Sequence, residues 1–234
     1  MARALRFRFF RDERLKYLAH LDVLRLFERA LKRSGLPVAY TQGFNPRQKI
    51  VFGLPMAVGL TSSAEYADIE FAGDLAPEAF ISRLNQVLPD GIKVLDAMPL
   101  LKKGSIMSQI TSAKYEIEFA VPRHMDYDEI NGIVIDFLGN EDITVMKKGK
   151  KGSKPVNIRP LIYSLSVRKP DNDGYILDAF LSAGAKNNLR PDLLMKALNL
   201  ITGLDLAVGS IHRKAMYTSA FNEWKDPFEV ANDD

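Results

Sequence analysis

The feature that most constrains the fold is an order of strand-like and helix-like segments that occurs twice along the 234 residues. Strand-like segments carry apolar residues at every second position, and helix-like segments carry them at every third or fourth. The first half has predicted strands at 3–10, 49–52, 65–71 and 91–95 and predicted helices at 20–34 and 77–88. The second half has predicted strands at 114–121, 143–147, 156–168, 174–183 and 208–217 and predicted helices at 126–138 and 190–200. Two tandem ferredoxin-like units, each βαββαβ, account for this order, so we predict an α+β fold.

The order of segments sets the expected domain boundaries, and the counts of acidic and basic residues show that charge is unevenly distributed among them. We expect a first unit at 1–98, a connector at 99–113, a second unit at 114–218 and an acidic tail at 219–234. The tail has five acidic residues and one lysine, a net charge of −4. Residues 1–218 therefore carry +7 in a chain whose net charge is +3. A basic body attracts nucleic acid or another polyanion, although an ordinary solvated surface explains this moderate surplus equally well.

Composition excludes several classes of site. The chain has no cysteine, which rules out disulfides, thiolate catalysis, thiolate-bound zinc and an iron–sulfur cluster held by this chain alone. We therefore expect no cofactor bound by this chain. No apolar run approaches the roughly 20 residues of a membrane helix, and residues 1–6 lead into a strand rather than a signal peptide. These features predict a cytoplasmic protein without membrane contact.

The helix predicted from residue 20 has a polar face rich in cations. Its expected buried stripe consists of Leu21, Leu24, Phe27 and Leu31, which recur at the helical period. The polar positions are Asp22, Arg25, Arg29, Lys32 and Arg33. Spacings of three and four residues place these cations along one stripe. Such a stripe suits an anionic partner, and Arg25 and Arg29 are therefore candidate nucleic-acid-binding residues.

His20 stands at the start of this helix, next to Asp22, and has two interpretations. A histidine in this place is a candidate general base, because imidazole exchanges protons near neutral pH. Alternatively, His20 caps the helix or forms a buried hydrogen bond. No second histidine lies near it in the sequence, so we predict no metal site.

The loop that follows the helix combines an aromatic ring with turn residues and cations. Gly43, Asn45 and Pro46 favour a turn, and Phe44 lies between them. Arg47 and Lys49 follow directly. An exposed phenylalanine beside cations allows a base to stack while its phosphate is neutralised. The alternative is that Phe44 points inward and anchors the loop.

Two carboxylates, Glu65 and Asp68, lie on the strand predicted at 65–71. Alternation places them on opposite faces of that strand, so they are not expected to form a catalytic pair. We expect one of them to pair with an arginine, either Arg25, Arg29 or Arg47, and thereby to shape the loop.

The second half contains a lysine-rich segment, Lys147, Lys148, Lys150, Lys151 and Lys154, interrupted by glycine and serine. Arg159 follows shortly afterwards. The segment is either a cationic contact for a polyanion or a well-solvated hairpin loop, because runs of charge are usually solvated.

Several motifs in residues 20–68, namely HLD, RLFERALKRSGLPVAYTQGFNP and LPMAVGLTSSAEYADIEF, carry a resemblance. They resemble the radical-SAM-linked protein family of unknown function, whose members occur alone or fused to a radical-SAM enzyme with a B12-binding region. Weaker matches lie at 84–91, 156–161 and 190–198. The resemblance implies a standalone form that works with a separate cluster-bearing enzyme, and it names no substrate.

Two functional hypotheses follow. The first is a non-catalytic module that binds RNA or presents a substrate, as partner of a radical-SAM enzyme or in RNA maturation. In it, RNA contacts the cations and Phe44 named above. The second is a metal-independent RNA-processing endonuclease in which His20 is the general base. We favour the first, because His20 is the one plausible base and no complete catalytic constellation is evident around it.

Overall fold

The structure, a computed structural model, describes residues 2–101, 104–122, 125–149, 152–170, 174–220 and 223–232. The chain forms two compact units. Unit 1 comprises Met1–Thr111 and Ala215–Asp234, and unit 2 comprises Ser112–Lys214. Both contain helices and mostly antiparallel strands, which confirms the predicted α+β class. The residues predicted as an acidic tail, 219–234, belong to unit 1.

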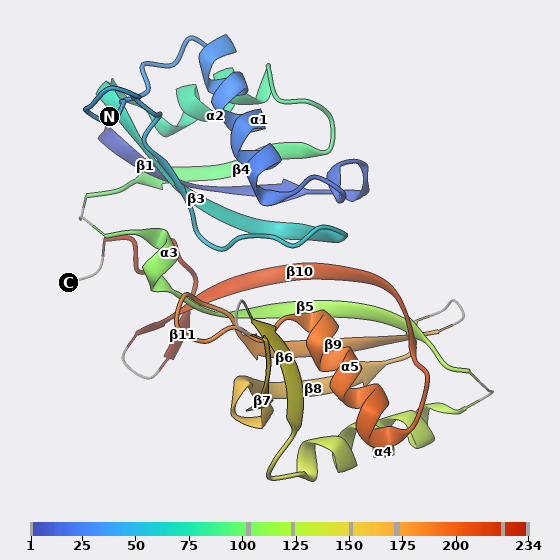
Figure 1. The fold of residues 1–234 in the computed structure, drawn as a ribbon. Coiled ribbons are helices and arrows are strands. Elements are labelled where there is room, and N and C mark those ends of the chain that lie inside the picture. Colours follow the sequence, from blue (N-terminus) through green and yellow to red (C-terminus); the bar gives the residue numbers. More distant parts are fainter. Residues whose placement is uncertain are drawn as a thin grey trace. The chain divides into compact units, whose positions relative to one another are not determined.

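Unit 1 contains a twisted sheet covered by two helices. Its elements are β1 (Ala2–Arg11), η1 (Glu13–Leu15), α1 (His20–Arg33), β2 (Ile50–Phe52), β3 (Leu60–Leu75), α2 (Pro77–Asn85), β4 (Ile92–Pro99), α3 (Ile106–Gln109) and β11 (Glu223–Lys225). The strand order is β4-β1-β3, and β2 pairs with β3. Each of these pairings is antiparallel. Helices α1 and α2 lie on the same face of the sheet (Figure 1).

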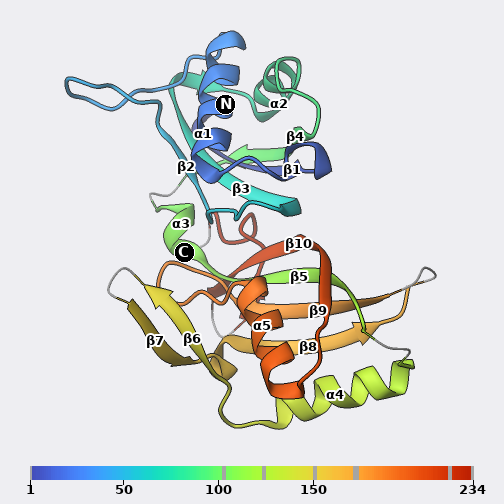
Figure 2. The same cartoon turned by 45° about the vertical axis from the view of Figure 1, so that its right-hand side comes forward.

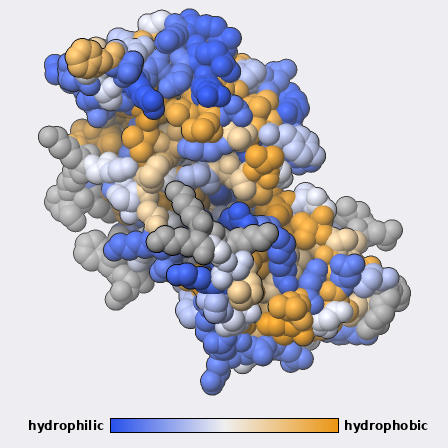
Figure 3. Space-filling view, viewed as in Figure 1, coloured by the Kyte–Doolittle hydropathy of each residue, from blue (hydrophilic) through white to orange (hydrophobic). Residues whose placement is uncertain are grey.

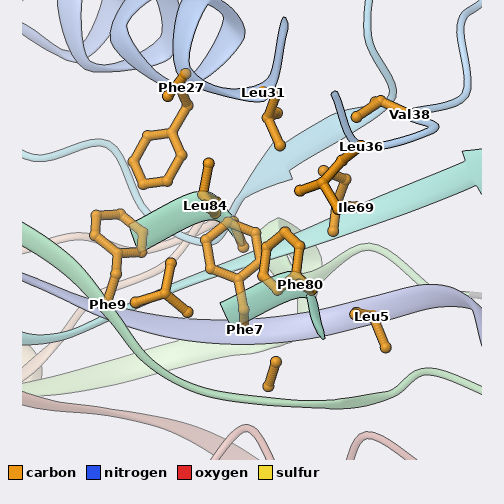
Figure 4. Packing of buried hydrophobic residues seen from close by; sticks show 14 of the residues in the cluster. Leu5, Phe7, Phe9, Phe27, Leu31, Leu36, Val38, Ile69, Phe80 and Leu84 are labelled. Atoms are coloured by element: carbon orange, nitrogen blue, oxygen red, sulfur yellow. The ribbon is translucent and has the colours of Figure 1, made fainter. Parts of the chain in front are cut away.

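The alternation of β1 builds the core of unit 1. Leu5, Phe7 and Phe9 are buried on the face that α1 and α2 cover, as predicted. The ring of Phe7 lies 5.8 Å from that of Phe27 in α1 and 5.1 Å from that of Phe80 in α2 (Figure 4). Rings at such distances bury a large apolar area and add favourable edge contacts. This aromatic cluster fixes both helices against the sheet.

The buried stripe of α1 differs from the prediction. The buried residues are Val23, Leu26, Phe27, Ala30 and Leu31, whereas Leu21 is 61% exposed. Both sets follow the helical period, but the observed set forms a broader stripe that begins at Val23. Because the sheet lies under that stripe, Leu21 is left on the outward side of the helix.

Unit 2 contains a main sheet, two α-helices and a separate two-stranded hairpin. Its elements are β5 (Ile110–Ala120), α4 (Tyr127–Gly139), β6 (Thr144–Gly149), β7 (Gly152–Asn157), η2 (Arg159–Leu161), β8 (Ile162–Arg168), β9 (Tyr175–Ser182), α5 (Pro191–Thr202) and β10 (Ala207–Ala220). The main sheet has the order β10-β5-β9-β8, and β6 pairs with β7 separately. Residues 215–220 of β10 belong to unit 1.

The core of unit 2 lies between this sheet and its two helices. Ile117 of β5 is paired with Leu177 of β9, and both are fully buried. Phe137 of α4 and Leu194 of α5 are buried as well. Helix α4 begins at a capping box, in which the Asp126 side chain accepts from the Glu129 backbone and the Glu129 side chain accepts from the Asp126 backbone. The predicted helix at this place is therefore confirmed.

The long strand predicted at 156–168 is wrong in one respect, because the structure divides it into β7 and β8. The two strands are separated by η2, with Pro160 inside its first turn. The Asn157 side chain accepts hydrogen bonds from the backbone N–H of Ile143 and of Arg159. Proline and a side chain that binds the local backbone both favour a turn over a strand.

Candidate nucleic-acid interface

The loop between α1 and β2 is a short ribbon with a bent tip. Tyr40 pairs with Gln48 across the ribbon, and the Thr41 N–H donates to the carbonyl of Arg47 at 2.8 Å. The Arg47 N–H donates in turn to Thr41 Oγ1 at 3.0 Å. Gly43 has a backbone φ of 120°, a conformation that residues other than glycine rarely adopt. The ribbon thus holds residues 42–46 away from the body of unit 1 (Figure 2).

Phe44 lies at this tip and is fully exposed, with a relative accessibility of 106%. The alternative in which Phe44 anchors the loop from inside is therefore wrong. Burial of a phenylalanine side chain is worth about 1.5 to 3 kcal/mol, and unit 1 does not use that energy. Asn45 and Pro46 are exposed beside it.

The cations predicted for this region differ in whether they form ion pairs with carboxylates. Arg25 is exposed and lies 3.4 Å from the Asp22 carboxylate, and Lys49 lies 2.7 Å from that of Glu70. Arg29 and Arg47 are exposed, and neither side chain forms an ion pair within the described part of unit 1. In the orientation of Figure 3 the surface over α1 is mainly hydrophilic. Unit 1 therefore presents cations on α1 and on the loop that carries Phe44.

His20 does not have the capping role considered for it. The N-cap of α1 is Ala19, which makes no side-chain cap hydrogen bond. The half-buried His20 ring meets the Phe52 ring edge-on, with centroids 5.8 Å apart. The side chain has no hydrogen bond to any described residue. His20 thus packs against the core, and no described carboxylate or cation is bonded to it.

Asp68 is a structural residue, and its partner is Arg6 rather than Arg25, Arg29 or Arg47. The Arg6 side chain is completely buried. Its Nε donates to Asp68 Oδ1 at 2.8 Å and its Nη2 to Asp68 Oδ2 at 3.1 Å. Asp68 Oδ2 also accepts from the Ile106 N–H at 3.1 Å, so the pair links β1, β3 and α3. Glu65 is buried in β3 as well.

The C-terminal residues of unit 1 complete this cluster. Arg6 Nη1 donates to the carbonyl of Pro227 at 2.8 Å, and the Tyr66 hydroxyl donates to Asp226 at 2.7 Å. Phe228 lies edge-on to the Tyr66 ring, with the Arg8 guanidinium 5.7 Å from its centroid. Segment 226–228 is thus part of the fold. One local signal pointed to such partners, since Arg6 and Arg8 alternate with the core residues of β1 and need polar groups to bind.

Burial raises the pKa of Tyr66 above its ordinary value of 10, and the hydrogen bond to Asp226 raises it further. A raised folded-state pKa contributes stability that is complete below pH 10 and is lost as the pH rises above it. We expect the free energy of unfolding to fall by about 1.4 kcal/mol per pH unit there because of Tyr66.

Urea denaturation of the wild type and of Tyr66→Phe at about pH 9 and about pH 11 measures this contribution. Tyr66→Phe should lose less stability over the interval. Tyr17→Phe is the matched control, because its ring is 74% exposed. Parallel losses in wild type and Tyr66→Phe would contradict the assignment.

The predicted cations of unit 2 are arranged differently from those of unit 1. The Arg159 guanidinium turns inward and donates to the carbonyls of Leu138 and Ile162, which makes it a structural residue. Lys147 donates to the carbonyl of Asn188 at 3.4 Å and faces Lys154 across the β6–β7 hairpin. Lys150 and Lys151 and the side chain of Lys148 lie outside the described residues.

Among the residues that the structure describes there is neither a candidate metal site nor a membrane-spanning helix. No group of three or more histidines and carboxylates within them has the spacing to hold a metal ion. None of their helices is long and apolar enough to span a membrane.

One known structure shares the fold at low sequence identity, and a second is reported beside it. A chain in a crystal structure of a Cbf5–Nop10–Gar1 complex is 9% identical, with a TM-score of 0.51 over 90% of this chain and 49% of that chain. A chain in the archaeal box H/ACA sRNP Nop10–Cbf5 complex is 10% identical, with a TM-score of 0.49 over 89% and 46%. This chain therefore spans about half the length of those chains, and the likeness concerns the fold alone.

Comparison at the level of sequence points to one bacterial family. No curated protein matches the chain. A family model described as "Uncharacterized protein conserved in bacteria (DUF2344)" matches residues 4–191, which is most of the chain. The protein therefore belongs to this DUF2344 family.

Proposed function

We propose that this protein is an RNA-binding module that holds single-stranded RNA on the Phe44 loop and the cations of unit 1. The observation that carries the proposal is the complete exposure of Phe44 at the tip of a hydrogen-bonded ribbon. A base that stacks on an exposed aromatic ring contributes about 1 to 3 kcal/mol. Because the ribbon already positions the ring, little conformational entropy is lost on binding.

The cations near the ring suit the phosphates of the same strand. Arg47 follows Phe44 by three residues and is exposed, so it is placed to neutralise a phosphate next to a stacked base. Arg25 and Arg29 are four residues apart on the outward side of α1. The exposed pairs of Arg25 with Asp22 and of Lys49 with Glu70 are worth little, so these cations can exchange a carboxylate for a phosphate.

We infer a finer fold class from the strand orders. When the strands of each main sheet are numbered in chain order, unit 1 reads 4-1-3-2, with β2 at the edge, and unit 2 also reads 4-1-3-2. Each βαββαβ order then corresponds to a ferredoxin-like unit, with the β6–β7 hairpin inserted in unit 2. RNA-recognition domains use a four-stranded sheet of this kind. A solved structure with another strand order in either unit would overturn this inference.

A partnership with a separate radical-SAM enzyme is a further part of the proposal. It rests on the resemblance of residues 20–68, because the family description names no partner. An RNA held by unit 1 would then be the substrate that this enzyme modifies. Purification of the tagged protein from its own cells tests this: recovery of a cluster-bearing enzyme supports the partnership, and its absence under mild salt argues against it.

The Phe44 loop is tested by replacing its ring. We expect Phe44→Ala to weaken binding of a single-stranded RNA oligonucleotide by about 5- to 150-fold, the equivalent of one stacked base. Phe44→Trp keeps a stacking surface and should bind like the wild type. Leu101→Ala is the matched control, since Leu101 is an exposed apolar residue elsewhere in unit 1.

Fluorescence anisotropy at low salt gives the four dissociation constants. Equal affinity of Phe44→Ala and wild type, or no RNA binding by the wild type, would overturn the proposal. If Phe44→Ala instead loses a protein partner while RNA binding is unchanged, the ring belongs to a protein interface.

A further inference from the structure

The main sheet of unit 2 has one face covered by helices and one face open to solvent. Helices α4 and α5 cover the first face (Figure 2). On the second face the strand pairings bring together Lys114 of β5, Phe180 of β9 and Ser164 of β8. Lys114 and Ser164 are exposed and Phe180 is half-buried. None of these residues was identified as a site residue from the sequence.

A cavity of about 320 Å³ lies on this open face. Its lining includes Lys114, Ser164, Ser166, Asp178, Phe180 and Lys214. The volume is at the lower end of the range of small-molecule sites, about 300 to 1,000 Å³, which corresponds to a ligand the size of one nucleotide. The cavity is therefore lined by two ammonium groups, two serine hydroxyls, a carboxylate and the Phe180 ring.

Phe180, which lines the cavity, packs against an aromatic ring outside the lining. The rings of Phe180 and Tyr163 have centroids 5.1 Å apart, and Tyr163 is 42% exposed. The Lys114 ammonium lies 5.6 Å from the centroid of Phe180. A phosphate that pairs with this ammonium is therefore held close to the Phe180 ring.

The carboxylates of this face are largely neutralised by their own partners. Arg168 donates to Asp178 and, at 2.6 Å, to Glu116. Lys214 lies 3.3 Å from the same Glu116 oxygen. Of the charged residues that line the cavity, Lys114 and Lys214 are cations and Asp178 is an anion, so the lining carries one net positive charge. An anionic ligand is favoured there over a cationic one.

We propose that this cavity binds a nucleotide, with the phosphate at Lys114 and Lys214 and the base on the Phe180–Tyr163 pair. The Asp178 carboxylate is placed to accept from a ribose hydroxyl, and Ser164 and Ser166 can hydrogen-bond the base edge. This site lies wholly in unit 2 and does not depend on the Phe44 loop. The nucleotide is either free or one unit of a single strand, because both offer the same groups.

Binding of AMP, UMP and a short single-stranded RNA to the full chain tests the proposal by calorimetry at low salt. Phe180→Ala should weaken AMP and UMP binding by about 5- to 150-fold, as expected for one stacked base. Because Phe180 is half-buried, Lys114→Ala provides a second variant on an exposed residue, with an expected loss of about tenfold. Lys196→Ala, an exposed lysine on α5, is the matched control.

The outcomes separate this site from the one in unit 1. Phe44→Ala should leave AMP binding unchanged, so that failure at one site does not affect the test of the other. AMP binding that Phe180→Ala weakens assigns the site to a free nucleotide, whereas oligonucleotide binding that Phe180→Ala weakens in the absence of AMP binding assigns it to a strand. Inorganic phosphate binding as tightly as AMP, or Lys114→Ala and Phe180→Ala both binding like the wild type, would overturn the proposal.

Discussion

Replacing Asp68 by asparagine is expected to lower the free energy of unfolding by about 3 to 5 kcal/mol, because it removes one partner of a buried ion pair. The Arg6 guanidinium has no access to water and relies on both Asp68 oxygens for compensation of its charge. The amide can accept one of those hydrogen bonds but carries no charge. The buried arginine is then left without a counter-charge, which is more costly than the loss of a surface pair.

The matched control is Asp74→Asn, which changes the same functional group in an exposed pair. Asp74 lies 3.7 Å from Arg3, and both side chains are largely exposed. Exposed pairs contribute about 0 to 1 kcal/mol, so this variant should unfold close to the wild type. Urea denaturation gives both values, provided that the slope of the transition stays constant. If Asp68→Asn is within about 1 kcal/mol of the wild type, Arg6 is compensated by other groups.

Local patterns predicted the core of unit 1 well. The alternation of Leu5, Phe7 and Phe9 in β1 identified the face of the strand that the helices bury. Successive side chains of a strand point to opposite faces of its sheet, so the face under the helices collects the apolar residues. The period of α1 identified a helix but not its exact orientation. Leu21 and Val23 both belong to apolar stripes of the same period, and only packing against the sheet places Val23 inside.

Contacts between residues distant in sequence were not predictable. Arg6 meets Pro227 and Tyr66 meets Asp226, at separations that no local pattern encodes. The C-terminal residues look like a solvated acidic tail because their composition is polar. Composition does not show that Asp226 accepts a hydrogen bond from the hydroxyl of the buried Tyr66. The partner of Asp68 was missed for the same reason, since Arg6 is its neighbour across β1 and β3 and was not among the arginines considered for Glu65 or Asp68.

The candidate sites show the same difference between local patterns, which were predictable, and contacts between distant residues, which were not. The sequence placed Phe44 in a turn with cations but left its orientation open, because a turn can point a ring either way. The open face of unit 2 gave no local motif, since Lys114, Ser164 and Phe180 come from three strands and meet only through their register. Arg159 shows the converse, because an arginine beside a lysine-rich segment proved to bind backbone carbonyls.

The affinity of the wild-type protein for single-stranded RNA is expected to fall by about 3,000-fold between about 50 mM and about 500 mM salt. This value follows from five cations of unit 1, the exposed Arg25, Arg29, Lys32 and Arg47 and the half-buried Lys49. Each phosphate that a cation neutralises releases counterions, and for single strands the logarithmic slope is about −0.7 per contact. Five contacts therefore give a slope of about −3.5.

The variant with Arg25, Arg29 and Arg47 all changed to glutamine isolates this surface. With two of the five contacts left, its slope should be about −1.4, which is a loss of about 25-fold over the same range. Lys196→Gln, on α5 of unit 2, should keep the wild-type slope. Phe44→Ala should also keep it, because stacking is insensitive to salt and shifts affinity equally at every concentration. A triple variant with the wild-type slope would place the phosphate contacts elsewhere, and a salt-independent wild type would remove the electrostatic basis of the proposed RNA binding.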